Sequence, residues 1–215
     1  MPSSVRSRRP AAPSARRPRK RAYHHGDLRR ALLEEAVRTI QAEGVEGVTL
    51  RQVGERLGVS RTALYRHFAD KGALLAAVAR EGFRTFRDAL AQGVAGAATA
   101  EAGFAAMGHA YVRFAVTHSS HYRVMFGGFV DACDRDPELE AEASAGFMVL
   151  VDAIVRQQAT GHLRADDPQQ MARYVWSVMH GVAMLIIDGQ LRGADPEAEV
   201  AYAIDRLNRG IVAVR

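Results

Sequence analysis

Cysteine is nearly absent from this sequence. Its 215 residues include one, Cys133, which excludes a disulfide within the chain and leaves a metal site no second thiolate. We expect Cys133 to be an unreactive residue in a loop. His118 and His121 are spaced i, i+3, but no cysteine or carboxylate stands near them at metal-ligand spacing. The sequence therefore predicts no metal site.

Long apolar runs are absent as well. No stretch of about eighteen apolar residues occurs, which is the length a membrane-spanning helix needs. The arginine-rich N-terminus lacks the apolar segment of a secretory signal. No Gly-x-Ser-x-Gly, phosphate-loop or dinucleotide-binding pattern is present either. We therefore expect a cytoplasmic protein with no membrane contact, no cofactor and no catalytic site.

Acidic residues are missing from positions 1–21, which hold eight arginines and lysines. The net charge of the chain is +5, so the remaining residues carry a net charge of −3. Four prolines interleave with these cations and prevent a regular helix, which predicts a disordered basic arm over 1–21. Such an arm suits a polyanion such as DNA phosphate, and the alternative is a passive tail.

Strand patterns are not apparent, whereas helical spacing recurs along the chain. Hydrophobic residues make up 48% of the sequence, enough for a sizeable core. Three Asp-Pro pairs each place a capping carboxylate before a proline at the first helical position. They predict helices of about 20, 23 and 16 residues, the second ending near Leu191, and they are Asp136-Pro137, Asp167-Pro168 and Asp195-Pro196. We predict an all-α protein of about nine helices.

Residues 49–71 contain two short amphipathic helices joined at a glycine. Leu50, Val53 and Leu57 recur at i, i+3 and i+7, which predicts one apolar stripe on the first helix. Thr49 is expected to cap this helix, and Gly58 to end it. The spacing is typical of a helix–turn–helix that binds DNA, although any short helical hairpin shares part of it.

The second helix of this pair presents polar side chains. Ser60 is expected to cap it, Leu64 and Phe68 return to the core at i, i+4, and Gly54 permits close packing between the two helices. The outward residues would then meet DNA bases and phosphates. The predicted DNA-binding residues are Thr49, Ser60, Arg61, Thr62, Tyr65, Arg66, His67 and Lys71.

The sequence resembles the tetracycline-repressor (TetR) family over roughly residues 22–213. The matching motifs are Ser60 to Phe68 (SRTALYRHF), Asp70 to Leu74 (DKGAL) and Tyr23 to Arg29 (YHHGDLR), with Trp176, His180 and Gly181 as the Trp-His-Gly signature of one branch. At Ser119 the chain departs from that branch, which has proline there. The resemblance implies a helix–turn–helix domain over 22–72, containing three helices, and a helical effector-binding and dimerisation domain over 73–215. It also implies that Tyr65, His67 and Lys71 contact phosphates.

The predicted helix from Pro168 to about Leu191 has two adjacent apolar stripes. One stripe would face the subunit's own core. The other, with the last helix, would form the four-helix dimer interface that the resemblance implies; two core helices of a monomer are the alternative. The predicted dimer-interface residues are Val175, Met179, Val182, Ile186, Val200, Ile204, Leu207 and Ile211.

The second stripe offers an aromatic ring, a titratable group and a thioether to a ligand. The alternative is an ordinary core with a hydrogen-bonded histidine, and the resemblance favours an effector cavity. The predicted ligand-binding residues are Tyr111, His118, Tyr122, Met125, Phe126, Trp176, His180 and Met184.

These observations predict a homodimeric regulator of transcription, a repressor, that binds a palindromic double-stranded DNA operator and is released by a small-molecule effector. An activator remains open within the same class. A helical enzyme fused to a DNA-binding head, or an architectural DNA-binding protein driven by the basic arm, are the alternatives from other classes.

Overall fold

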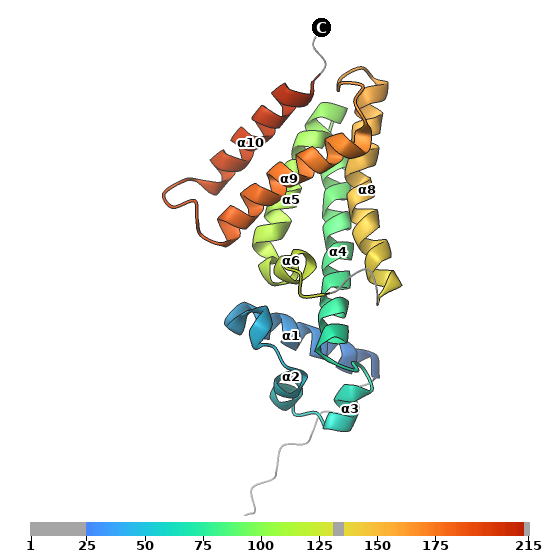
Figure 1. The fold of residues 1–215 in the computed structure, drawn as a ribbon, viewed down its shortest axis with the longest axis vertical. Helices are drawn as coiled ribbons and strands as arrows, with labels where there is room; N and C mark the ends of the chain where they lie inside the picture. The colour runs from blue at the N-terminus through green and yellow to red at the C-terminus, as the bar shows by residue number, and fades with distance from the viewer. Residues whose placement is uncertain (1–24, 131–135, 213–215) are drawn as a thin grey trace, which may run out of the picture.

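The computed structural model describes residues 25–130 and 136–212, which form an elongated all-helical molecule (Figure 1). The predicted all-α fold of about nine helices is confirmed, and no strand occurs within the described ranges. The basic arm, the start of the Tyr23 motif and Cys133 lie outside them. The helices are α1 (His25–Gly47), α2 (Leu50–Leu57), α3 (Arg61–Tyr65), α4 (Lys71–Ala95), α5 (Ala100–Thr117), α6 (Ser119–Phe126), α8 (Pro137–Ala159), α9 (Pro168–Ile187) and α10 (Pro196–Ile211).

Side-chain caps fix where most of these helices begin. Thr49 Oγ1 accepts a hydrogen bond from the Gln52 amide at 3.2 Å, and Ser60 Oγ accepts one from the Ala63 amide at 3.2 Å. Asp70 caps α4 in the same way. All three Asp-Pro pairs start helices as predicted, with Asp136, Asp167 and Asp195 as the caps. Each cap satisfies an amide that has no partner within its helix.

Glycines in the left-handed region interrupt or end several helices. Gly58 ends α2 at φ 65°, as predicted. Gly44 has φ 79° and interrupts α1, although helical turns continue to Gly47. The predicted end of α9 near Leu191 is wrong, because the helix ends at Ile187 and Gly189 turns the chain at φ 64°.

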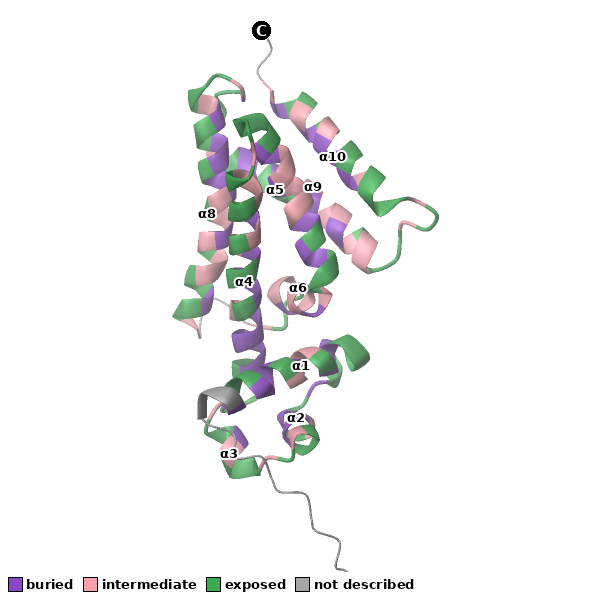
Figure 2. Ribbon diagram, turned by 180° about the vertical axis from the view of Figure 1, so that it is seen from behind, coloured by how far each residue is buried: buried purple, intermediate pink, exposed green. Residues whose placement is uncertain are grey.

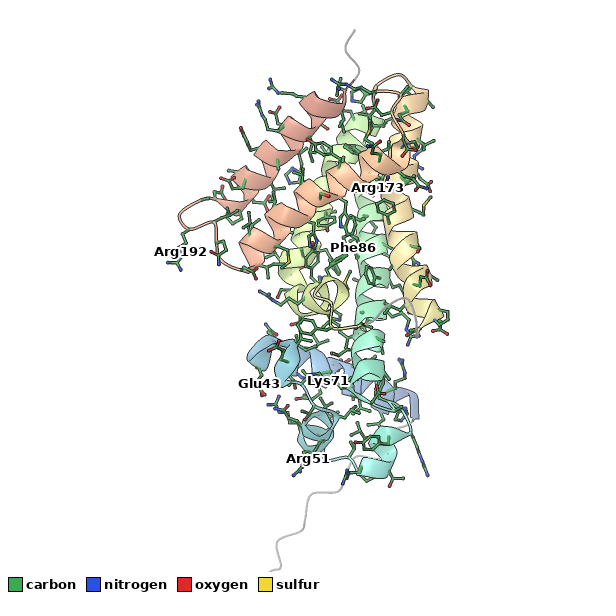
Figure 3. All side chains as sticks on the ribbon, viewed as in Figure 1. Glu43, Arg51, Lys71, Phe86, Arg173 and Arg192 are labelled. Carbon is green, nitrogen blue, oxygen red and sulfur yellow. The ribbon has the colours of Figure 1, made fainter. Side chains whose placement is uncertain are left out.

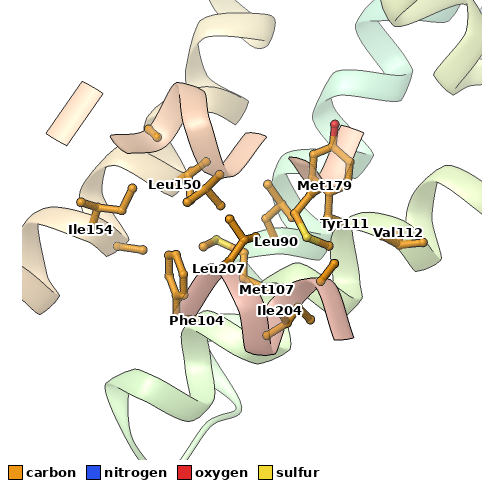
Figure 4. Packing of buried hydrophobic residues seen from close by; sticks show 14 of the residues in the cluster. Leu90, Phe104, Met107, Tyr111, Val112, Leu150, Ile154, Met179, Ile204 and Leu207 are labelled. Atoms are coloured by element: carbon orange, nitrogen blue, oxygen red, sulfur yellow. The ribbon is translucent and has the colours of Figure 1, made fainter. Parts of the chain in front are cut away.

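Two hydrophobic clusters share the long helix α4, which runs from one end of the molecule to the other (Figure 1). Its first half, from Leu74 to Phe83, is buried with α1, α2 and α3 in a head cluster. Phe86 and Leu90 belong to a body cluster with α5, α8, α9 and α10 (Figure 4). Figure 2 shows α4 buried most continuously beside α1, with exposed and buried residues alternating farther along the helix. Because one continuous helix serves both clusters, the head and the body are mechanically joined.

Helix α6 lies between the head and the body. Val124 is buried in the head cluster, whereas Tyr122 is buried in the body cluster. Met125 and Phe126 pack against both. The α6 segment therefore forms a second connection beside α4.

Candidate nucleic-acid interface and ligand cavity

Helices α2 and α3 pack closely through Gly54. A Cβ atom at this position would lie 3.1 Å from Leu64 Cδ2, tighter than ordinary van der Waals contact. Leu64 and Phe68 are both buried in the head cluster. The predicted close approach and the buried side of α3 are therefore confirmed, and they fix which face of α3 points outward.

The outward face of α3 is polar and accessible. Arg61, Thr62 and Arg66 are exposed, and the Tyr65 side chain is 48% exposed. Figure 3 shows side chains extending from α3 at the far end of the head. A helix of this pair that exposes two guanidinium groups and a hydroxyl has the geometry to enter the DNA major groove, where arginine reads guanine.

Helix α2 is clamped to α1 by polar contacts. Gln52 Nε2 donates to Glu43 Oε2 at 2.7 Å, and Arg56 pairs with the same carboxylate. Arg56 also donates to the buried Thr39 hydroxyl at 2.9 Å. The hydrogen bonds from Gln52 and then Arg56 hold the pKa of Glu43 below its usual value. These contacts of Glu43 join α2 to α1.

The remaining predicted DNA-binding residues differ in how free their side chains are to contact DNA. Thr49 and Ser60 already use their hydroxyl oxygens as caps. His67 and Lys71 are half-buried. Lys71 Nζ donates to the Glu46 carbonyl at 2.9 Å, which ties the start of α4 to the end of α1. The ammonium group has two further donors, so this contact leaves it able to meet a phosphate.

The body contains a partly open cavity of about 300 Å³ between α4, α5, α6, α8, α9 and α10. Seven of the residues that line it are aromatic and two are methionines, and none carries a formal charge. Residues from this wall appear in Figure 4. The lining residues are Phe83, Phe86, Leu90, Phe104, Met107, Gly108, Tyr111, Phe126, Ala143, Gly146, Phe147, Leu150, Val175, Trp176, Met179, Ile204, Leu207 and Asn208.

A chain of hydrogen bonds stands behind one wall of the cavity. Trp176 Nε1 donates to the Tyr111 hydroxyl at 3.0 Å, and the Tyr111 and Tyr122 hydroxyls are 2.8 Å apart. The Tyr122 hydroxyl lies 2.6 Å from His180 Nδ1. Burial raises the pKa of Tyr111 to about 12 and also raises that of Tyr122, whereas burial lowers the pKa of His180. A neutral imidazole that accepts at Nδ1 completes the chain.

The predicted ligand-binding residues do not all share this cavity. Tyr111, Phe126 and Trp176 line it, and Tyr122 and His180 lie behind its wall. The other three lie outside this cavity, and their role as ligand contacts stays a prediction. Met125 packs at Gly82, where its sulfur would lie 2.6 Å from an added Cβ. His118 stacks on Phe114 at 4.8 Å, and Met184 lines a separate hollow beside the head.

Several cavity residues were missed by the sequence reasoning. Phe83, Phe86 and Leu90 follow each other at i, i+3 and i+7 on α4, a spacing that was readable from the sequence. Phe147 lines the cavity with Ala143, Gly146 and Leu150 of α8, and Asn208 lines it with Ile204 and Leu207 of α10. Helical spacing groups these residues on one face, but it does not show which distant helix that face meets. Their placement depends on how α8 and α10 close over α4 and α5.

The predicted dimer-interface residues lie mostly inside the subunit. Val175, Met179, Val200, Ile204, Leu207 and Ile211 are buried in the chain's own body cluster. Val182 and Ile186 are half-buried against that cluster. Because α9 contacts α5, α8 and α10, one subunit covers its first apolar stripe and part of its second. The large apolar residues left exposed on the last two helices are Tyr174, Trp176, Leu185 and Tyr202.

Within 25–130 and 136–212, no three or more His, Cys, Asp or Glu side chains gather as metal ligands. None of the helices described there combines the length and apolar character needed to cross a membrane.

Comparison with known proteins assigns both parts of the chain to one family. Residues 32–78 match the model described as "Bacterial regulatory proteins, tetR family". Residues 104–207 match the model described as "Tetracyclin repressor-like, C-terminal domain". The first segment covers α2, α3 and most of α1, and the second covers most of the body, so the two models span most of the described chain.

Individual relatives support the same assignment. The chain is 47% identical over 51 residues to the tetracycline repressor protein class C of Escherichia coli, a match of 24% of this chain and 23% of the relative. It is 39% identical over 64 residues to the transcriptional repressor AcnR of Corynebacterium diphtheriae, covering 30% of this chain and 34% of the relative. The chain thus matches only about a quarter to a third of the length of these curated relatives.

The similarity to a solved structure extends further. A protein of unknown function from Rhodococcus sp. RHA1 is 35% identical, with a TM-score of 0.81. The match covers 90% of this chain and 100% of that structure. The head and the body therefore occur together, in the same arrangement, in another protein.

Proposed function

Because this chain belongs to the tetracycline-repressor family of bacterial regulatory proteins, we propose that it represses transcription by binding a palindromic DNA operator as a homodimer. A small molecule that enters the body cavity releases the operator. The outward face of α3, held by a head that α4 joins to the cavity, carries the proposal. The proposed activity is binding, needs no catalytic step and takes place in the cytoplasm.

The finer assignment within the family is part of the same proposal. Trp176, His180 and Gly181 fit the branch with a Trp-His-Gly signature. Trp176 and His180 both lie within hydrogen-bond distance of the Tyr111 hydroxyl, and His180 also contacts Tyr122, so two of these residues belong to one hydrogen-bonded group. Gly181 lies on the outer side of α9, where an added Cβ would meet nothing within 4 Å.

The proposed dimer interface uses the exposed faces of the last two helices. Tyr174, Gly181 and Leu185 share one side of α9, because they are spaced by seven and four residues. Tyr174 is 50% exposed and Leu185 44% exposed, and Tyr202 on α10 is 62% exposed. A glycine between two apolar side chains allows a partner helix to approach closely. These residues replace the buried set that the sequence pattern indicated.

Two α3 helices in such a dimer would enter successive major grooves, roughly 34–36 Å apart. A ligand that favours a different separation of the heads lowers operator affinity, provided it binds the two states unequally. Phe126 supports this coupling. It lines the cavity and packs edge-on against Phe83, with ring centroids 5.4 Å apart, at the boundary between the two clusters.

The test of DNA reading is a binding-site selection with the full-length protein and the variant Arg61→Ala. Arg61 is exposed at the start of α3, so its loss should relax the preferred motif at particular positions, by about 1–3 kcal/mol where it contacts a base. Tyr65→Phe should instead weaken binding to all sequences alike, because the hydroxyl is assigned to a phosphate.

Arg192→Ala is the matched control, because Arg192 is also exposed but lies in the loop after α9, far from the head (Figure 3). It removes the same charge and should leave both motif and affinity unchanged. A selection in which Arg61→Ala returns the motif of the unaltered protein would refute the base-reading role. Absence of sequence preference in the unaltered protein would refute the proposed function.

A further inference from the structure

We propose that the body cavity binds an uncharged molecule of about two aromatic rings with one hydrogen-bonding group, which the Asn208 side chain holds. This inference rests on the proposed function, because it names the class of effector. It draws on the charge, hydrogen bonds, size and side-chain types of the cavity wall.

The cavity wall has no charged group that could pair with an ionic ligand. None of the lining residues is an acid, a base or a histidine. A carboxylate, phosphate or ammonium group would lose its hydration on entry and meet no opposite charge, which is strongly unfavourable. A fatty acid or a nucleotide therefore does not fit this wall, and a neutral molecule does.

Two of the three polar lining residues already use their polar groups. The Trp176 indole N–H is donated to Tyr111, and the Tyr111 hydroxyl lies within hydrogen-bond distance of Tyr122 and His180. With the Tyr122 hydroxyl donating to His180 Nδ1 and the Tyr111 hydroxyl donating to Tyr122, each hydroxyl both donates and accepts once. A ligand gains little from this wall except apolar contact.

Asn208 is the third polar residue, and its amide is available. It lines the cavity from α10, and no hydrogen bond to its side chain is present among the described residues. Its main-chain oxygen, in contrast, accepts from the Val212 amide at 2.9 Å and closes the helix. The amide group offers two donors and one acceptor, so it can bind a hydroxyl or a carbonyl.

The size and the side chains of the wall favour rings. An apolar cavity of about 150 Å³ holds one benzene molecule, so about 300 Å³ has room for roughly two rings. Aromatic side chains from five helices line the cavity, several of them edge to face, as in the pairs of Phe86 with Tyr111 and Phe147 with Trp176. Met107 and Met179 add polarisable sulfur. A ring gains edge and face contacts here that an alkyl chain does not.

Isothermal titration calorimetry with the full-length protein can test each part separately. The neutral probe is 2-naphthol. Two charged probes have the same ring system: the carboxylate 2-naphthoate and the ammonium ion of 2-(aminomethyl)naphthalene. Naphthalene lacks a polar group, and 1-decanol lacks a ring. We expect 2-naphthol to bind at one site per chain, at least about tenfold tighter than either ion. Binding of an ion or of 1-decanol as tightly as 2-naphthol would overturn the inference.

Two variants locate the site. Asn208→Leu keeps the side-chain size and removes the amide, so 2-naphthol should bind about fivefold more weakly while naphthalene is unaffected. Gly146→Leu places a side chain in the cavity beside Phe86 and should abolish binding of both. Equal binding of 2-naphthol to Asn208→Leu and to the unaltered protein would overturn the role of Asn208. Continued binding to Gly146→Leu would show that the site lies elsewhere.

Operator binding, measured on the same preparations, separates this inference from the proposed function. If no probe binds while sequence-specific DNA binding persists, the ligand class is wrong and the DNA-binding function stands. If 2-naphthol binds as expected but no DNA sequence is preferred, the ligand class stands and the proposed function fails.

Discussion

The head and the body each have an apolar core, but they differ in what else fixes their helices. In the head, short helices α2 and α3 depend on caps at Thr49 and Ser60 and on the polar clamp of Glu43, Gln52 and Arg56. In the body, longer helices meet through aromatic and aliphatic side chains around a cavity. A reading surface needs fixed side-chain positions, whereas a cavity for a ligand needs incompletely filled space. The two regions differ because they meet opposite packing requirements.

The largest expected effect concerns the core of the head. Leu64→Ala removes a buried side chain that packs at Gly54, which should destabilise the head by about 2–5 kcal/mol and abolish operator binding. Chemical unfolding followed by far-UV circular dichroism measures the loss. Trp176, the single tryptophan, lies in the body, so its emission should keep its unfolding midpoint.

Val155→Ala is the control for this comparison. It is an exposed apolar side chain on α8, and its truncation should change stability by less than about 0.5 kcal/mol. If Leu64→Ala moves the Trp176 midpoint together with the dichroism, then α4 makes the head and the body one cooperative unit. The prediction that the head and the body unfold separately would then be wrong.

The second effect tests the outer face of the body. Gly181→Gln adds a side chain that meets nothing within the subunit, so the fold of one chain should be retained while the partner helix is displaced. We expect monomers by sedimentation velocity and at least about tenfold weaker operator binding, because two half-sites are no longer bound together. Ala159→Gln, exposed on α8, should leave the assembly unchanged. A dimeric Gly181→Gln protein would place the interface elsewhere.

The head could be predicted in detail because its signals are local. The cap at Thr49, the turn at Gly58 and the buried side of α3 each depend on residues within one or two turns. The three Asp-Pro helix starts in the body are local signals of the same kind and were also predicted. Local hydrogen bonds and steric limits suffice to place such features.

The faces of α9 could not be assigned from the sequence, for a physical reason. Periodicity shows that α9 has two apolar stripes, but not which neighbour covers each. The stripe of Val175 and Met179 faces the cavity, because α10 folds back and completes the core from the other side. The predicted interface was therefore buried, and His180 was placed as a ligand contact although Tyr122 holds its Nδ1. Both depend on contacts between distant segments.

The third effect is a pH dependence that arises where the two regions meet. Burial, and then the nearby His118, lowers the pKa of His121 on α6 to about 4. The fold therefore favours the neutral ring, and stability present above about pH 6.5 is lost as pH falls toward 4. We expect a loss of about 1–3 kcal/mol over this window, since part of the ring stays in solvent.

The unfolding free energy of His121→Gln, measured between pH 7 and pH 4, should depend less on pH. Some dependence should remain, because burial also lowers the pKa of His180. His162→Gln, in the loop between α8 and α9, is the control and should retain the full dependence. An unchanged pH profile in His121→Gln would show that His121 takes up its proton without cost to the fold.

The smallest expected effect concerns the basic arm. Its removal should change how DNA affinity varies with salt concentration and leave the preferred DNA sequence unchanged. Residues 1–21 hold eight of the chain's cations, and the rest of the chain is net acidic. Each phosphate that the arm neutralises should contribute about −0.9 to the slope of log affinity against log salt concentration. Removal of residues 1–21 should therefore flatten that slope by about one for each phosphate that is no longer neutralised, whereas Arg61→Ala alters the motif. Identical slopes for the truncated and complete chains would make the arm a passive tail and assign all DNA binding to the head.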